Sequence, residues 1–390
     1  MKRIISVMLA LTLALTVLVA PGAMAESATG GKILFMANTS SGAVYDFNVA
    51  YMDMWMSELG YDWEMIYGDS ANDPAGNLAA VQNAMTSDVV ALIACQDGGI
   101  GDIMAEYPEI YVVGYLNDMA SVYSEGGASA ACKDNDHFLG TVASGLANGE
   151  DIGKMYAQQV IDAGYKKIAI CMSPAFAYPQ YAIADATIRA EIEAYNATVG
   201  DDEKIEVVGD SATVLMFSPI PDSFFNEPEN QDLDAIVGLC GGQIFCYPPM
   251  LTAISNGLAN PDMKLLTSGF ENDPDMMADV GTGIVQVLNV NNFESLLYCI
   301  VMLDNALQGN QFADFTAPEV LDAAMLKITN VEIMTNIVNN SAQADADMSK
   351  LAVSLEDGKQ YFTRYTENAT YEGLKDLLSS DQLTEAGYAE

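Results

Sequence analysis

KILFMANTSSGAVYDFN, residues 32–48, joins a short apolar run to a polar turn with two aromatic residues, and a helical pattern follows. A short apolar run bounded by turn residues is typical of a buried β-strand. A closely similar run, KIAICM, returns at residues 167–172. This return indicates that the chain contains an internal repeat.

The repeat extends beyond the first strand. Three more strand-like segments recur in the same order at slowly growing offsets: EMIYGDS (64–70) as EVVGDS (206–211), DVVALIAC (88–95) as DAIVGLC (234–240), and EIYVVGY (109–115) as KLLTSGF (264–270). Four matches in one order are hard to attribute to chance. The sequence therefore predicts two similar α/β lobes of roughly 120–150 residues each.

Helical patterns separate the strand-like segments. Strands are predicted at 33–37, 63–67, 89–95, 110–115, 167–172, 205–208, 235–240, 264–269 and 284–288, and helices at 49–59, 78–85, 153–163 and 183–194. Strands alternating with helices form parallel sheets that are covered on both faces. Such sheets bind ligands beyond the carboxyl ends of their strands. The turn from Asn38 to Asn48 is therefore predicted to be a ligand-facing loop.

Residues 1–25 have the pattern of a secretory signal peptide. Lys2 and Arg3 precede an apolar run, and Ala23-Met24-Ala25 is a small-x-small cleavage pattern. The run is shorter than the ~20 apolar residues that a spanning helix needs. We therefore expect an exported chain, in the periplasm or on the outer side of a bacterial membrane.

The formal net charge of the chain is −39. A body of this charge repels nucleic acid and anionic membrane surfaces, so we expect no nucleic-acid partner. We interpret the acidic residues as a solvated shell that keeps an exported protein monomeric.

Six cysteines leave two interpretations open. An even count in an exported chain permits disulfides, whereas a large core does not need them. Cys95, Cys171, Cys240 and Cys299 lie in apolar runs, where a free thiol behaves as a small hydrophobe. We expect Cys95, Cys171 and Cys240 to be buried and reduced, and we expect no metal site because no C-x-x-C pair or His cluster accompanies them.

The chain resembles a class I periplasmic binding protein of the ribose-binding kind. The motifs that carry the resemblance lie between residues 32 and 330 in the family's order: KILFMANTSSGAVYDFN, DVVALIACQDGG, VVGYLND, KDNDHFLG, LDAIVGLCGG, LLTSGFENDPD and GTGIVQVLN. The resemblance implies two Rossmann-like, doubly wound lobes joined by a three-segment hinge. The family's members are the solute receptors of ABC importers.

The family's three crossings divide this chain between the lobes. The resemblance implies a first lobe of residues 32–131 and 290–325, and a second of 132–289 and 326–365, with hinge points near Ala131, Asn289 and Met325. The acidic tail at 366–390 extends beyond the usual family length. A short terminal helix and a disordered end both fit it.

In the first lobe, the candidate ligand contacts follow the strands. Asn38, Tyr45 and Phe47 follow the first strand, and each aromatic residue either faces the ligand or packs into its own helix. Gln96 and Asp97 end the third strand, and Asp97 has capping of the next helix as an alternative role. Asn117 and Asp118 end the fourth, where relatives place an Asp that accepts sugar hydroxyls.

The second lobe supplies the other candidates. Phe176 and Tyr178 follow its first strand, and Arg189 matches the family's sugar-binding Arg, with pairing to Glu193 as the alternative. Three departures from the family pattern also fall at candidate sites: Gln243 in Gly-Gly-Gln for Asn-Asp, Glu271 for Asp, and Asn289 for Gln. Aromatic faces and polar edge groups suit a sugar.

The resemblance implies an importer's binding protein that takes up a small polyol, such as a monosaccharide, and docks on ABC permease subunits. The alternative is a receptor that senses a nucleoside, a signalling furanone or another small polar molecule. We expect no enzyme activity, because His137 is the chain's one histidine and no nucleophile pairs recognisably with it. We expect no cofactor.

Overall fold

The first lobe is built on a six-stranded parallel sheet. The computed structural model describes residues 30–68, 73–143, 149–175, 179–214, 218–239, 241–269, 274–323, 326–328 and 331–378. The strands of this sheet lie in the order β12 (Val320–Asp322), β5 (Phe138–Ala143), β4 (Tyr111–Tyr115), β3 (Val89–Ala94), β1 (Lys32–Ala37) and β2 (Asp62–Tyr67). Each pair of neighbours is parallel. Parallel neighbours need long crossovers, and helices supply most of them.

Helices cover both faces of the first sheet. They are α2 (Ala43–Leu59), α3 (Pro74–Ala84), α4 (Ile100–Glu106), α5 (Ala120–Tyr123), η1 (Ala130–Asp134), η5 (Phe293–Ser295) and α11 (Leu296–Leu307). One apolar core joins α2 and α11 to one face and includes Trp55 and Tyr298. A second core lies under α3 and α4. The two-sided burial predicted for the strands is confirmed, because five of the six residues of β1 are buried.

The second lobe repeats this arrangement. Its sheet has the order β13 (Leu326–Lys327), β11 (Val285–Val290), β10 (Lys264–Ser268), β9 (Ala235–Gly238), β6 (Lys167–Met172) and β7 (Glu206–Val207), and β8 (Ala212–Thr213) also pairs with β6. All pairs are parallel except β11 with β13. The order β10-β9-β6-β7 is the order β4-β3-β1-β2 of the first sheet. The internal repeat read from the sequence is confirmed.

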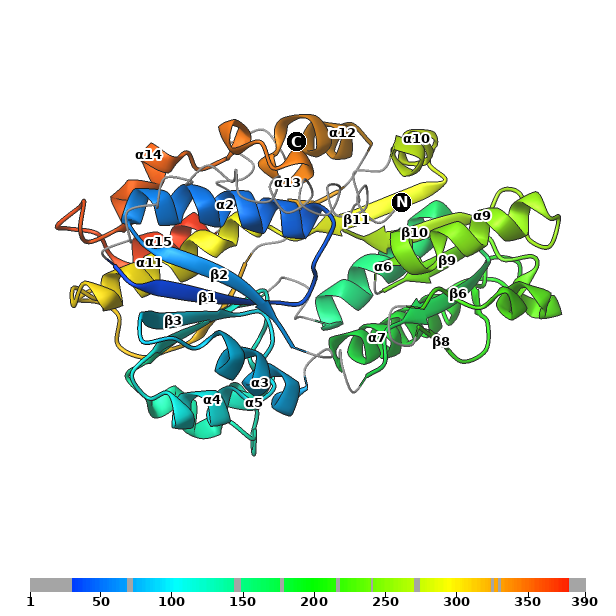
Figure 1. Cartoon of the computed structure of the whole chain (residues 1–390). Helices are drawn as coiled ribbons and strands as arrows, with labels where there is room; N and C mark the ends of the chain where they lie inside the picture. The colour runs from blue at the N-terminus through cyan, green and yellow to red at the C-terminus, as the bar shows by residue number, and fades with distance from the viewer. Residues whose placement is uncertain are drawn as a thin grey trace, which may run out of the picture.

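The second sheet is also covered on both faces. Its surrounding elements are α6 (Gly149–Ala163), α7 (Pro179–Asn196), η3 (Asp222–Asn226), η4 (Pro228–Asn230), α8 (Gly242–Phe245), α9 (Tyr247–Ser255), α10 (Pro274–Thr282) and α12 (Val331–Asn340). The cores on its two faces are separate clusters. Figure 1 shows that the strand arrows of each sheet point toward the other lobe, so the carboxyl ends of the two sheets face one another.

The first crossing between the lobes comes later than predicted. β5 pairs with β4 and with β12, so residues 138–143 complete the first sheet. The chain leaves the first lobe only after Ala143, and the predicted boundary at Ala131 is wrong. An apolar strand that opens a new segment carries no local sign of the sheet it will join, because either sheet buries it equally well.

The C-terminal part also departs from the prediction. α12 packs in the second-lobe core, but α13 (Ala342–Asp345) lies against α2 of the first lobe. The chain continues on the first lobe through η6 (Met348–Lys350), α14 (Leu355–Gly358), η7 (Lys359–Tyr361) and α15 (Tyr371–Leu377). Figure 1 shows α13 and α14 lying along α2. The assignment of residues up to 365 to the second lobe is therefore wrong, and the described start of the tail forms a helix.

Buried polar contacts attach this C-terminal segment to the first lobe. Arg364 donates to both carboxylate oxygens of Asp304, which is 1% exposed, and to the carbonyl of Leu59. Phe362 stacks on Trp55 with ring centroids 5.0 Å apart. Gly358 passes so close to Trp55 that a Cβ atom would lie 2.7 Å from the indole. The segment is thus part of the first-lobe core and not a surface tail.

Two of the three cysteines expected to be buried and reduced lie in the described part of the chain. Cys95 and Cys171 are both buried and free, as are Cys132 and Cys299, and Cys246 is buried as well. Cys240 lies outside the described residues. Burial raises the pKa of the Cys95 thiol, so it stays protonated at neutral pH.

Glu294 is a buried carboxyl group directly after the second crossing. It is 6% exposed and accepts hydrogen bonds from the backbone N–H groups of Ala352 (2.9 Å) and Val353 (3.0 Å). Burial raises its pKa to about 7, against the lowering effect of these two donors. Desolvation outweighs the two bonds because the charged form loses its hydration.

Glu294→Gln should change how stability depends on pH. The raised pKa means that the folded wild type holds a proton that the unfolded chain releases near pH 4.5, so stability is lost as pH rises from about 4.5 to about 7. Glutamine does not titrate. We expect the free energy of unfolding of the wild type, relative to the variant, to fall by about 3 kcal/mol across this range.

Urea unfolding of both proteins from pH 4.5 to pH 8 measures this difference. Glu229→Gln, at an exposed position in the second lobe, is the matched control and should follow the wild type. Parallel curves for wild type and Glu294→Gln would contradict the prediction.

Candidate functional site

Three predicted site residues of the first lobe hold the strand ends together. Gln96 is buried and donates to the carbonyl of Ala37 at the end of β1. Asp97 is buried and accepts from the N–H of Ser121 at 2.6 Å, so its carboxylate serves α5 and not the helix after its own strand. Asn117 donates to the carbonyl of Cys95. These three residues thus support the strand ends through contacts within the first lobe.

Asp118 is the acidic group that this scaffold presents. Its neighbours Leu116 and Met119 have φ angles of 51° and 50°, a left-handed conformation that costs energy for residues other than glycine. Asp118 accepts from the N–H of Ala120. Burial raises the pKa of its carboxyl, and Asp97 and Asp322 raise it further. Strained backbone and a crowded carboxylate at one strand end are typical of a functional site.

Asp322 was missed by the sequence analysis. It is the last residue of β12, it is exposed, and its charge acts on Asp118. β12 pairs with β5 up to Asp322 opposite Ala143, so this carboxylate lies at the same edge of the sheet as the predicted residues. A strand of three residues is too short to be recognised by its periodicity, so Asp322 could not be predicted from the sequence.

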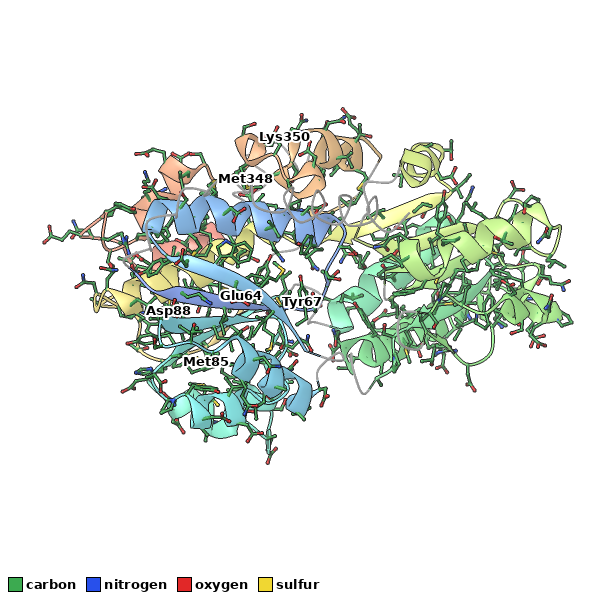
Figure 2. All side chains as sticks on the ribbon, viewed as in Figure 1. Glu64, Tyr67, Met85, Asp88, Met348 and Lys350 are labelled. Carbon is green, nitrogen blue, oxygen red and sulfur yellow. The ribbon has the colours of Figure 1, made fainter. Side chains whose placement is uncertain are left out.

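The aromatic residues divide between core and surface. Phe47 is fully buried and stacks on Tyr51 at 5.1 Å, so the expectation that it contacts a ligand is wrong. Tyr45 is half-buried in the first turn of α2. Tyr67, which was not predicted as a site residue, ends β2 and is 40% exposed. Burial raises the pKa of the Tyr67 hydroxyl, and nearby Tyr45 raises it further. Figure 2 labels Tyr67 near the end of β2 that points toward the second lobe.

Asn38 and the second-lobe candidates lie at strand ends. Asn38 is exposed directly after β1. Gln243 of α8 is half-buried and accepts from the hydroxyl of Thr267 at 2.9 Å. Asn289 is fully buried in β11, and its carbonyl accepts from the N–H of Gly269 at 2.7 Å. Asn289 is therefore part of the buried interior of the second sheet, whereas Asn38 and Gln243 are accessible to solvent.

Arg189 lies ten residues into α7 and is engaged in two contacts. Its Nε donates to Asp185 Oδ1 at 2.9 Å, and its Nη2 donates to Ser211 Oγ at 2.9 Å. The alternative of an ion pair was correct in kind, but the partner is Asp185 and not Glu193. Because Ser211 directly precedes β8, these contacts tie α7 to the end strand of the sheet.

Phe176, Tyr178 and Glu271 lie outside the described residues, as do the signal-peptide pattern and Met325. Among the residues that the structure describes, no helix is both long and apolar enough to cross a membrane. No group of three or more His, Cys, Asp or Glu side chains that could hold a metal ion occurs there either.

A shallow pocket of about 540 Å³ lies within the first lobe, between α3, α4 and η1. Small residues such as Gly101, Ala128 and Ser129 line it, together with Asp102 and Met104. None of the predicted ligand residues lines it. The site argued from the strand ends is therefore a different surface, the edge that faces the other lobe.

This edge can recognise a ligand rich in hydrogen-bond donors. Its exposed and half-exposed groups are two carboxylates (Asp118 and Asp322), an amide (Asn38) and two tyrosines (Tyr45 and Tyr67), and the facing edge of the second lobe adds the amide of Gln243. Carboxylates accept hydroxyl hydrogens, and aromatic rings pack on apolar C–H faces.

The chain was compared with known proteins. No protein-family model matches it, and no curated protein matches it. Solved structures match with TM-scores just above 0.5. A glucose-galactose binding protein from Geobacillus stearothermophilus is 13% identical, has a TM-score of 0.53 and is covered over 98% of its length by 77% of this chain.

Two more structures show the same likeness. An ABC transporter solute-binding protein from Burkholderia graminis, in complex with D-arabinose, is 14% identical, with a TM-score of 0.53 and coverage of 79% of this chain and 98% of that one. A periplasmic ribose ABC transporter protein from Conexibacter woesei is 13% identical, with a TM-score of 0.55 and coverage of 81% and 97%. These likenesses show that the chain has the two-lobed fold of type I periplasmic binding proteins.

Replacing the two aromatic residues after β1, Tyr45 and Phe47, should lower the free energy of unfolding by different amounts. Phe47→Ala removes a fully buried ring and should cost 3–5 kcal/mol, estimated roughly from other large-to-small core changes. Tyr45→Ala removes a half-exposed ring and should cost about 1 kcal/mol or less. Urea unfolding of both variants measures the difference. Equal costs would show that Tyr45 also belongs to the core.

Proposed function

We propose that this protein is an exported solute-binding protein of an ABC importer and that it binds a small neutral polyol, such as a monosaccharide, between the facing strand ends. The observation that carries the proposal is Asp118, a half-buried carboxylate on a strained strand end, with Asp322 beside it. The structures with the same fold have titles that name sugars, which supports this ligand class.

The charges at the strand ends favour neutral ligands over anions. Asp118 and Asp322 repel a phosphate or carboxylate. The guanidinium of Arg189 is held by Asp185 and Ser211, so we leave Arg189 out of the proposed ligand set. A sugar hydroxyl donates to a carboxylate and stabilises its charged form, which burial disfavours.

The proposed ligand set joins groups of both lobes. Asp118, Asp322 and Asn38 would bind hydroxyl groups, Tyr45 and Tyr67 would pack on C–H faces, and Gln243 would contact the ligand from the second lobe. Binding in this position closes the lobes, because the ligand contacts both. Permease subunits would then read the closed form, with the signal-peptide pattern of residues 1–25 directing export.

A thermal-shift screen tests the ligand class. Neutral pentoses and hexoses, nucleosides, amino acids and sugar phosphates are added separately to the full chain. A ligand present at about 100 times its Kd stabilises by roughly 2.7 kcal/mol. We expect the shift from a neutral sugar. Stabilisation by an amino acid or a sugar phosphate alone would overturn the proposal.

Asp118→Asn tests the residue that carries the proposal. Asparagine keeps an oxygen for the N–H of Ala120 but loses the charge, so we expect sugar affinity to fall by about tenfold or more, as for a charged hydrogen bond. Asp347→Asn is the matched control, because Asp347 makes the same local contact, to the N–H of Ser349, far along the C-terminal segment. Calorimetry measures both. Equal affinities for the two variants would remove Asp118 from the site.

A further inference from the structure

The chain crosses between the lobes once more than the three crossings of the family it resembles. After β13 and α12, which belong to the second lobe, it returns to the first lobe at Ser341. The matched structures cover 77–81% of this chain and 97–98% of their own. This chain therefore contains residues with no counterpart in those structures, and residues 1–29 are too few to account for the whole unmatched part.

The fourth crossing lies where the cores of the two lobes meet. Ile333, Met334 and Ile337 of α12 pack in the second-lobe core. Ala342 of α13 packs in the first-lobe core, and Ala344, two residues later, packs in the second again. One short helix thus contributes to both cores.

The fourth crossing is bonded to the second. The second crossing leads from β11 into η5, and the N–H of Phe293 donates to Gln343 Oε1 at 2.5 Å. Gln343 is 2% exposed. On its other side Phe293 packs against Phe47 of α2, with centroids 5.7 Å apart. The second crossing is therefore held between α2 and α13.

A second contact between the two crossings lies one residue further along the chain. The carboxyl group of Glu294 accepts from the N–H groups of Ala352 and Val353, which follow η6 on the C-terminal segment. Leu351 and Val353 pack against the first-lobe core beside these bonds. Two successive residues after the second crossing, Phe293 and Glu294, are thus hydrogen-bonded to the C-terminal segment, and this segment packs on the first lobe.

We propose that the fourth crossing is a hinge clamp, in which Gln343 and the segment around residue 352 fix the second crossing and so limit how far the lobes move relative to one another. Lobe movement of this kind changes φ and ψ at a few residues of the connecting segments. A buried N–H that loses its acceptor costs free energy, so rotation at Phe293 is opposed as long as Gln343 accepts from it.

The clamp also bears on ligand affinity. When only part of the population has the orientation that binds, the apparent affinity falls by that fraction. A clamp that narrows the range of orientations therefore sets the affinity without touching the ligand. The inference rests on the fold and the contacts, not on the proposed ligand, so its test uses no ligand and stands if the sugar proposal fails.

Spin-label distances across the lobes test the clamp. Tyr67→Cys at the end of β2 and Ile244→Cys in α8 place labels at exposed positions of the two facing edges. Gln343→Met is then introduced, because methionine keeps the length of the side chain and removes the amide group, and with it the Oε1 acceptor of the Phe293 N–H. We expect the distance distribution to broaden and its mean to shift relative to the labelled parent. Labelled chain without the two added cysteines gives the background.

Gln360→Met is the matched control. Gln360 lies on the same C-terminal segment, is exposed, and donates locally to the carbonyl of Asp357. Its distances should equal those of the parent. Gln343→Asn, whose side chain is too short to reach Phe293, provides a second variant if methionine lowers stability, and both are measured well below their melting temperatures. Distributions for both Gln343 variants that equal the Gln360→Met distribution would overturn the proposal.

Discussion

Parallel pairing of the strands is the constraint on which the rest of this structure depends. A parallel sheet delivers the carboxyl ends of its strands to one edge, and each strand must be joined to the next by a crossover. Both sheets have this arrangement, and their two carboxyl-end edges face each other. Polar residues directly after β1, β3 and β4 and the last residue of β12 lie at one edge because they end parallel strands, although they are far apart in the sequence.

The acidic residues do more than form a solvated shell. Several carboxylates accept from backbone N–H groups that no helix or strand satisfies: Asp97 from Ser121, Asp234 from Lys166 and Lys167, and Asp314 from Tyr371 and Glu372. A charged acceptor forms stronger hydrogen bonds than a neutral one. Part of the net charge of −39 thus fixes loops and the C-terminal segment to the lobes.

The sequence predicted the sheets better than it predicted their connections. The nine predicted strands all occur, because long apolar runs and their repetition are strong local signals. β5 was not among the predicted strands; it is buried throughout, and its pattern does not show which sheet it joins. The C-terminal segment is polar, and the few aromatic residues that anchor it, such as Phe362 and Tyr371, find partners only in the folded core.

For the site, the outcome depended on helix phase and on short elements. α2 begins at Ala43, six residues before the predicted start, so Phe47, Tyr51 and Trp55 form one buried stripe at four-residue spacing. With the helix start placed correctly, the burial of Phe47 was readable from the sequence. Asp322 was not readable, because its position follows from the pairing of a three-residue strand.

The facing edges and the hinge act on one another through charge. Burial raises the pKa of the Asp118 carboxyl, and the charges of Asp97 and Asp322 raise it further, so bringing the second lobe over this edge deepens the desolvation of both Asp118 and Asp322. Closure without a ligand is therefore opposed at the site itself. Hydrogen-bond donors supplied by a ligand offset this cost only when they reach the carboxylates. The proposed clamp at the fourth crossing limits the range of lobe orientations, and the desolvation of the carboxylates then opposes closure until a ligand donates to them.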